Sequence, residues 1–436
     1  MPPTVGPADV FPVRAARTGL FLAGGVLGFP IVAAFVAVAS PRLALLQHRS
    51  MPVLAANHLV TLLWGTMIAI GALHQLLPAA VGVRREPGRA VPWQFLVHVL
   101  GVVLMTAGFL GRSVDLLVAG AVLVAASIAI LLGVAASLIR QRRRTLPVLR
   151  FAIVALASLG ATATWGLLLV ANWKFVFWRD LIGPMGLAVH LALGLVGWFA
   201  FLITGVSYYL LPRFAGTGDL PGIRPEAVFW TLGAGLLLLV AGALFSPPLA
   251  RAGGAAVAAA GLLYTADLVR YLRAWRPHAP DITRAHWQVL AGEGALLSLG
   301  VLAWATGLLP GAASRWGVAG VALFLLGWVT LAITGQAFKV TPFLMWYYRF
   351  HLGMSALEVP RLPAPYWPRA ALPPFVLLAG APGLIALGVL RADPLTAAAG
   401  GVGFLAGACL FAFVLGYSWL PAWWSGRRPP RAAEPR

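Results

Sequence analysis

Three stretches of the sequence end in the same way: GALHQLLP (71–78), GVSYYLLP (205–212) and GQAFKVTP (335–342) each consist of a glycine, six residues and a proline. Each stretch closes a long apolar segment. Upstream of the last two, GWFAFLITG (197–205) and GWVTLAITG (327–335) match closely. Self-similarity at a fixed period indicates an internal repeat, and the period of about 130 residues has room for four membrane-spanning helices. The alternative is coincidence, because glycine and proline are frequent in membrane helices.

The composition indicates that the chain lies in a lipid bilayer. Of its 436 residues, 60% are hydrophobic and 10% are charged, which leaves too little polar surface for a water-soluble globule. A bilayer core about 30 Å thick needs about 20 apolar residues per helix, and such stretches recur along almost the whole chain. The net charge of +20 does not indicate nucleic-acid binding, because the arginines lie in short loops and form no basic domain. We interpret them as topology signals and as contacts for anionic lipid.

These patterns predict an all-α integral membrane protein with a single membrane domain over residues 1–436. Three pseudo-repeats of four helices are expected at about 18–140, 148–271 and 286–420. The first helix has no convincing cleavage site, so we expect it to be retained, and the lone Cys409 excludes a disulfide framework. The spans predicted from apolar runs are 18–40, 53–79, 92–110, 116–139, 151–171, 184–212, 226–246, 252–269, 286–309, 317–345, 371–390 and 396–420.

Lysine and arginine are distributed unequally between the predicted loops. The termini and the even-numbered loops hold 23 of the 32 basic residues, the odd-numbered loops hold 8, and Lys339 lies inside the tenth span. Cytoplasmic loops are enriched in Lys and Arg. The sequence therefore predicts that both termini lie on the cytoplasmic side of the inner membrane of the cell.

Two histidines lie at similar depths in predicted spans, His58 in the second and His190 in the sixth. Each is about six residues, or roughly 9 Å, from the predicted outer end of its helix. Ionisable residues inside a bilayer are costly and indicate function, and neutral imidazole is a strong axial ligand for haem iron. Three interpretations remain open: a shared b-type haem, another functional role for one histidine, or hydrogen bonds that only fix helix packing.

The stretch HLVTLLWGTMIAIGALHQLLP (58–78) resembles the second helix of subunit I of the haem-copper oxidases and bacterial nitric oxide reductases. The corresponding histidine there is an axial ligand of the low-spin haem. The stretch HLALGLVGWFAFLITGVSYYLLP (190–212) is similar to another haem-ligating helix of that superfamily. The resemblance implies a cytochrome c oxidase subunit I-like fold, with twelve helices in three arcs of four and cytoplasmic ends. It also implies haem b held by His58 and His190, a role in electron transfer or nitric oxide metabolism, and partners that are respiratory or denitrification subunits or a cytochrome.

The sequence departs from that superfamily at the catalytic centre. The low-spin haem of the superfamily lies between the second and tenth helices, but the tenth span here has no histidine over residues 317–335. The copper site needs a His-His pair and a His-x-His, and neither pattern occurs in the sequence. We therefore expect no copper and no conventional oxygen reduction. The closest analogy is to divergent subunit I-like proteins such as the NnrS family, and any enzymatic role would be that of a membrane oxidoreductase component.

A second hypothesis is a transporter or channel that uses His58, His190 and Glu293 as substrate or proton sites. The predicted four-helix units all have the same orientation in the membrane, whereas inverted repeats in transporters reverse orientation from one copy to the next. This difference favours the haem hypothesis. His286 and Glu293 lie seven residues apart on one helix face. They can relay protons or bind a cation, or Glu293 can instead pair with a loop arginine.

His74 and His98 lie near the same ends of adjacent spans and form a candidate second ligand pair. His74 follows His58 by sixteen residues, roughly 24 Å along a helix, so these two cannot share an iron.

The helical phase of His58 and His190 is a difficulty for a shared haem. His58 precedes its repeat glycine by thirteen residues and His190 by fifteen, and two residues turn an α-helix by about 200°. The two rings are therefore expected to face a common point only with a local shift or a differently placed helix.

Overall fold

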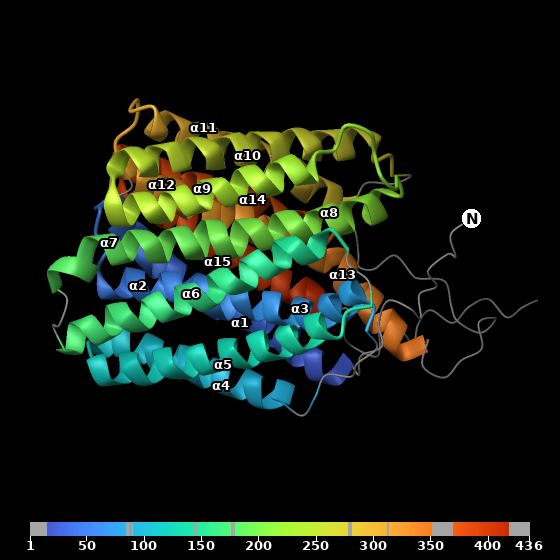
Figure 1. The fold of residues 1–436 in the computed structure, drawn as a ribbon, viewed down its shortest axis with the longest axis horizontal. Coiled ribbons are helices and arrows are strands. Elements are labelled where there is room, and N and C mark those ends of the chain that lie inside the picture. The colour runs from blue at the N-terminus through green and yellow to red at the C-terminus, as the bar shows by residue number, and fades with distance from the viewer. Residues whose placement is uncertain are drawn as a thin grey trace, which may run out of the picture.

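The computed structural model describes residues 15–83, 88, 90–143, 146–175, 179–277, 281–311, 314–350 and 369–417. In these ranges the regular secondary structure is helical, with no β-strand. Twelve helices are long and apolar enough to cross a membrane, and they run side by side as one bundle (Figure 1). The prediction of an all-α multi-pass membrane protein with twelve spans is therefore confirmed.

Nine of the spans are single α-helices in the described part of the chain. They are α1 (Ala15–Ala44), α4 (Ala90–Gly111), α5 (Val114–Arg140), α6 (Val148–Phe175), α9 (Pro225–Phe245), α10 (Pro247–Ala274), α11 (Ile282–Ala305), α14 (Leu372–Arg391) and α15 (Pro394–Tyr417). Every observed end lies within five residues of its predicted position. One boundary matters for the site residues. The ninth span begins at Ile282 and not at His286, because the Asp281 carboxylate caps α11 by accepting hydrogen bonds from the Thr283 and Arg284 N–H groups.

The second, sixth and tenth spans each change from α-helix to π-helix and back. Their segments are α2 (Met51–His58), η2 (Leu59–Thr66) and α3 (Met67–Val81); α7 (Arg179–Leu191), η3 (Ala192–Ala200) and α8 (Phe201–Ala215); and α12 (Arg315–Ala322), η4 (Leu323–Val329) and α13 (Thr330–Phe350). Each π-helical segment contains a tryptophan seven residues before the repeat glycine: Trp64, Trp198 and Trp328. The π-helix, with i→i+5 hydrogen bonds, is rare and is found often at functional sites. Its recurrence at equivalent places supports the threefold repeat.

Close glycine contacts join the last two helices of each four-helix unit. A Cβ on Gly101 would lie 3.0 Å from the carbonyl oxygen of Gly120 in the α4–α5 hairpin. A Cβ on Gly235 would lie 3.1 Å from that of Gly253 in the α9–α10 hairpin, and Gly400 makes a comparable contact with α14. Small residues let membrane helices approach closely. Because α1 packs against α15, the first and last units meet and the bundle closes on itself.

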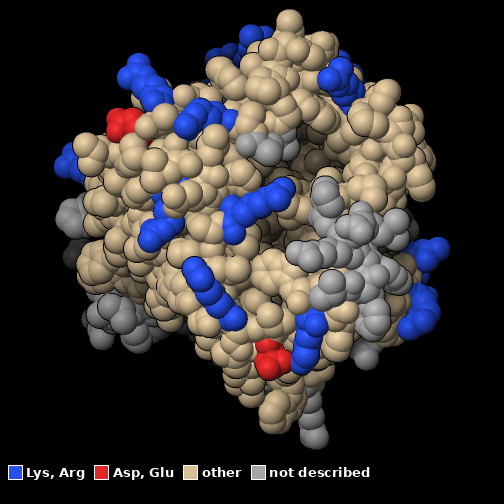
Figure 2. Space-filling model, turned by 90° about the vertical axis from the view of Figure 1, so that its left-hand side faces the viewer, with Lys and Arg blue, Asp and Glu red and all other residues tan. Residues whose placement is uncertain are grey.

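The two ends of the bundle differ in the number of described basic residues, although the end with more of them also carries Asp219, Glu226, Asp267 and Asp281. The end on the right of Figure 1, where α1 begins, carries the described basic residues Arg140, Arg142, Arg143, Arg150, Arg213, Arg224, Arg270, Arg273, Arg276, Arg284, Lys339 and Arg369. We call it the arginine-rich end. The opposite end, seen in Figure 2, carries Arg42, Arg49, Arg112, Lys174, Arg251, Arg315 and Arg391 with two described acidic residues, Asp115 and Asp393.

Asp267 on α10 holds the second unit together at the arginine-rich end. Its carboxylate is fully buried. It accepts hydrogen bonds from the Tyr208 hydroxyl (2.8 Å), the Arg224 backbone N–H (2.9 Å) and the Arg270 guanidinium (3.1 Å). These donors come from α8, from the residue before α9 and from α10, so one carboxylate joins three segments.

The substitution Asp267→Asn is expected to lower the free energy of unfolding by about 3 kcal/mol, because loss of one member of a buried charge pair leaves the other uncompensated. This is the lower end of the usual range, since both arginines are partly exposed. As a control, Glu226→Gln breaks the exposed ion pair with Arg150 and should cost at most about 1 kcal/mol. Thermal unfolding in detergent measures both, and equal losses would contradict this role of Asp267.

Candidate functional site

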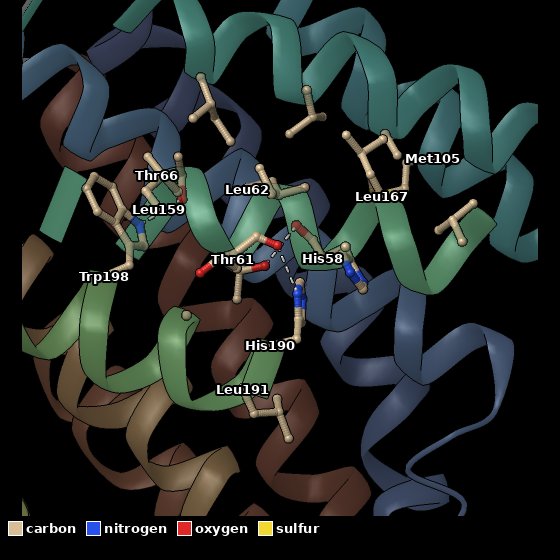
Figure 3. A pocket seen from close by; sticks show the side chains of 18 of the residues that line it. His58, Thr61, Leu62, Thr66, Met105, Leu159, Leu167, His190, Leu191 and Trp198 are labelled. Atoms are coloured by element: carbon tan, nitrogen blue, oxygen red, sulfur yellow. Dashed lines mark hydrogen bonds between the residues drawn. The ribbon is translucent and has the colours of Figure 1, made fainter. Parts of the chain in front are cut away.

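A pocket lies between η2, α4, α5, α6 and η3, in the half of the bundle toward the opposite end (Figure 3). Its cavity volume is about 140 Å³. Most of the wall is apolar, with side chains such as Met105, Phe109, Ile128 and Leu159. The polar or titratable lining residues are His58, Thr61, Thr66, Thr162, His190 and Trp198.

His58 is the last residue of α2, directly before the π-helical segment η2. Its Nδ1–H donates a hydrogen bond to the Leu54 carbonyl oxygen at 2.8 Å. A carbonyl oxygen can only accept, so Nδ1 carries the proton and Nε2 keeps its lone pair. The ring packs against Phe109, with 4.9 Å between the ring centroids, and both residues line the pocket.

His190 repeats this arrangement on the sixth span. Its Nδ1–H donates to the Thr162 carbonyl oxygen of α6 at 3.1 Å, which again leaves the lone pair on Nε2. Gly166, one turn further along α6, makes room for the ring, because a Cβ there would lie 3.3 Å from His190 Cε1. No pattern in the sequence indicates Thr162 or Gly166, since partners on another helix are determined by packing.

The structure brings the two histidines together. The ring centroids of His58 and His190 are 6.5 Å apart, with the ring planes tilted by 31°. The two rings come together although their helical phases relative to the repeat glycines differ, an approach that was expected only with a local shift or a differently placed helix. A π-helical segment follows His58 and another begins two residues after His190, so in both spans the turns between the histidine and the repeat glycine depart from α-helical spacing. The Trp198 indole N–H also donates to Thr66 Oγ1 at 3.1 Å, which joins η3 to η2.

His74 and His98 take part in a buried hydrogen-bond network. His74 Nε2 donates to Gln94 Oε1 (2.8 Å). His98 Nε2 donates to the Leu62 carbonyl oxygen of η2 (3.2 Å), and its Nδ1 bonds the Ser127 hydroxyl (3.2 Å). Both nitrogens of His98 are therefore occupied, and the candidate second ligand pair is not formed. Its bond to Leu62 ties α4 to the π-helical segment that follows His58.

Glu293 and His286 lie on α11, away from the pocket. No hydrogen bond or ion pair joins Glu293 to any residue that the structure describes, and its Oε2 is buried. The expected pairing with a loop arginine is thus not formed with a described arginine. Lys339 instead pairs with Asp281, with 2.7 Å between Nζ and Oδ2.

Among the remaining histidines, His48 lies in the turn between α1 and α2. His278 and His351, predicted to lie in loops, fall outside the described residues. No protein-family model matches this chain, and no curated protein matches it significantly.

Proposed function

We propose that the protein binds one b-type haem in the pocket between η2 and η3 and uses it to transfer electrons. The observation that carries the proposal is that two adjacent imidazoles have the same tautomer. His58 and His190 each donate Nδ1–H to a backbone carbonyl and keep the Nε2 lone pair. Histidines that ligate metals almost always donate their other ring N–H in this way, which fixes the tautomer and the ring orientation.

The separation of the two imidazoles fits such a group. Metal–imidazole bonds are about 2.0–2.1 Å long, so two imidazoles that ligate one ion from opposite sides have ring centroids roughly 6 Å apart. The observed separation of 6.5 Å is close to this value. The mostly apolar wall suits a mostly apolar cofactor.

The chemistry follows from the ligand set. A haem iron with two histidine ligands takes up and releases single electrons and has no open position for a substrate. The Leu54 and Thr162 carbonyls would hold the two rings in orientation, and the apolar wall would exclude water. The recurrence of the π-helical segments in three spans and the contact of α1 with α15 support the proposal of a cytochrome c oxidase subunit I-like arrangement. Within this proposal the electron donor or acceptor is a respiratory or denitrification subunit or a cytochrome, and the physiological role is electron transfer or nitric oxide metabolism.

The proposal is tested by purifying the full-length protein from cells supplied with a haem precursor. We expect about one haem b per chain, a reduced-minus-oxidised spectrum with the sharp bands of a six-coordinate haem, and iron without stoichiometric copper. A chain that stays free of haem under these conditions would overturn the proposal. Stoichiometric copper would contradict the expectation, drawn from the missing His-His and His-x-His patterns, that the protein binds no copper.

A transporter or channel is the second candidate, and the observation that favours it is that Glu293 has no partner among the described residues. An ionisable side chain without a partner inside a membrane bundle marks an ion or substrate pathway by default. The absence of haem from the purified protein, together with proton or solute flux in liposomes that Glu293→Gln abolishes, would favour this candidate.

The orientation in the inner membrane is a prediction from the loop charges. We expect a reporter fused after Arg144 to lie in the cytoplasm and one inserted before Arg315 to lie outside, because positively charged loops stay on the cytoplasmic side. Reporters that are active on only one side of the membrane measure this. The reverse result at both sites would place the termini outside.

A further inference from the structure

The interface between α11 and the tenth span (α12, η4 and α13) carries a row of ionisable groups, and we call this interface the α11 seam. At the arginine-rich end, Asp281 pairs with Lys339 of α13. Further in, His286 packs directly on the tenth span: a Cβ on Gly335 would lie 2.7 Å from the Cβ of His286. These two contacts follow one another along the seam.

Glu293 is the innermost group of the α11 seam. A Cβ on Gly327 would lie 2.7 Å from Glu293 Oε1 and 2.8 Å from Oε2, so the carboxylate fills the space that this glycine leaves on η4. Glu293 is eleven residues, or roughly 16 Å, along α11 from its first residue. This length places the carboxyl group near the middle of a bilayer core about 30 Å thick.

Unpaired buried polar atoms concentrate along α11. Nine side-chain nitrogen or oxygen atoms in the described residues are buried without a hydrogen-bond partner, and five of them belong to α11: Thr283 Oγ1, Arg284 Nε, His286 Nε2, Trp287 Nε1 and Glu293 Oε2. A sixth is Thr265 Oγ1 on α10, which faces Gly294 of α11, 3.2 Å from where a Cβ would lie. Leaving such a group unsatisfied costs about 1–3 kcal/mol. Polar buried positions of this kind are where proteins hold internal water.

Among the described residues, no charged neighbour serves as a counter-ion for Glu293. From α13 the only described ionisable group that faces the seam is Lys339, which Asp281 occupies. On α10, Asp267 is turned toward Arg224 and Arg270. The described part of η4 has no ionisable residue, and α14 presents Phe375 to the His286 ring.

We propose that the α11 seam is a proton pathway that connects the arginine-rich end of the bundle to Glu293. Protons enter near the Asp281–Lys339 pair and pass over internal water. His286 picks up a proton on Nε2 and releases it from the same atom, because its Nδ1–H stays bonded to the Ile282 carbonyl oxygen at 2.8 Å. At the end of the pathway the carboxylate of Glu293 takes the proton from a protonated internal water: an O–H bond of that water breaks, an O–H bond forms on the carboxylate, and Glu293 becomes a neutral carboxylic acid.

The test is infrared spectroscopy of the full-length protein in lipid nanodiscs. We expect a carbonyl-stretch band from a protonated carboxylic acid that disappears in Glu293→Gln and persists in Glu226→Gln, an exposed glutamate. After transfer to D₂O the band should shift as the acid exchanges its proton. His286→Leu should slow this exchange at least tenfold. Ser298→Ala, five residues beyond Glu293 toward the opposite end, should leave the rate unchanged.

Three results would overturn the pathway: no band assignable to Glu293 between pH 5 and pH 9, an unchanged exchange rate in His286→Leu, or slower exchange in Ser298→Ala. If His286→Leu fails to fold, Gly327→Ala serves instead, because its Cβ displaces the carboxyl end of a flexible side chain. That variant should shift the band and slow its exchange, and an unchanged band and rate would count against the pathway. The double variant His58→Ala, His190→Ala should behave like wild type here, so the failure of the haem proposal is distinguishable from the failure of this one.

Discussion

Replacing His58 or His190 with alanine is expected to convert a six-coordinate haem into a five-coordinate one, or to remove the haem. Each ring supplies one Nε2 lone pair, and alanine supplies no ligand in its place. Loss of a residue that only hydrogen-bonds to a metal ligand typically lowers metal affinity 10–100-fold. Loss of a ligand itself should therefore lower haem occupancy at least tenfold, unless the other histidine retains the haem. Absorption spectra and haem content per chain measure the change.

The matched control for these two variants is His286→Leu. His286 is also a buried intramembrane histidine whose Nδ1–H donates to a backbone carbonyl, but it lies on α11 and does not line the pocket. Its replacement should leave the haem spectrum unchanged. A His58→Ala or His190→Ala protein that keeps the full six-coordinate spectrum would show that the replaced histidine is not a ligand.

The second large effect is expected at Gly242 in the α9–α10 hairpin. A Cβ there would lie 2.0 Å from the backbone nitrogen of Ala250 and 2.4 Å from its Cα. Backbone atoms cannot rotate away, so Gly242→Ala must push the two helices apart. Overpacking in a core typically costs about 1–3 kcal/mol and occasionally more, and we expect a loss at or above the upper end of this range, with little folded protein recovered.

Gly233→Ala on the same helix is the control. Its nearest neighbour would be Phe201 Cζ at 3.8 Å, an ordinary contact. Alanine is also favoured over glycine in a helix by about 1 kcal/mol, so this variant should be neutral or slightly stabilising. Size-exclusion profiles and thermal unfolding compare the two variants. Similar behaviour in both would contradict the close packing of the hairpin.

Much of the fold could be predicted because bilayer spans leave a strong signal. The number and order of the helices follow from apolar run length alone, and the errors lie at the ends. The start of α7 at Arg179 and the start of α10 at Pro247 each came five residues earlier than predicted. Charged and proline residues end an apolar run but can continue a helix, and proline is favoured at a first helical position.

The candidate site was predictable only in part. His58 and His190 could be chosen from depth and repeat position, but their approach depends on how the two helices pack, which no local propensity rule identifies. One signal was present in the sequence. Tryptophan recurs seven residues before the glycine in all three repeats, and each copy lies in a π-helical segment. The partners of His98 and of Lys339 are long-range contacts between helices, and a single sequence carries no pattern that specifies them.

The central claim, that one haem iron is bound by the imidazoles of both His58 and His190, is tested most directly by electron-nuclear double resonance. The oxidised full-length protein would be labelled with ¹⁵N only in its histidine side chains. The account predicts a low-spin ferric signal coupled to two directly bound histidine nitrogens, one of which is lost in each single alanine variant that retains haem. A signal coupled to one histidine nitrogen or none, or two couplings that persist in either variant, would contradict it.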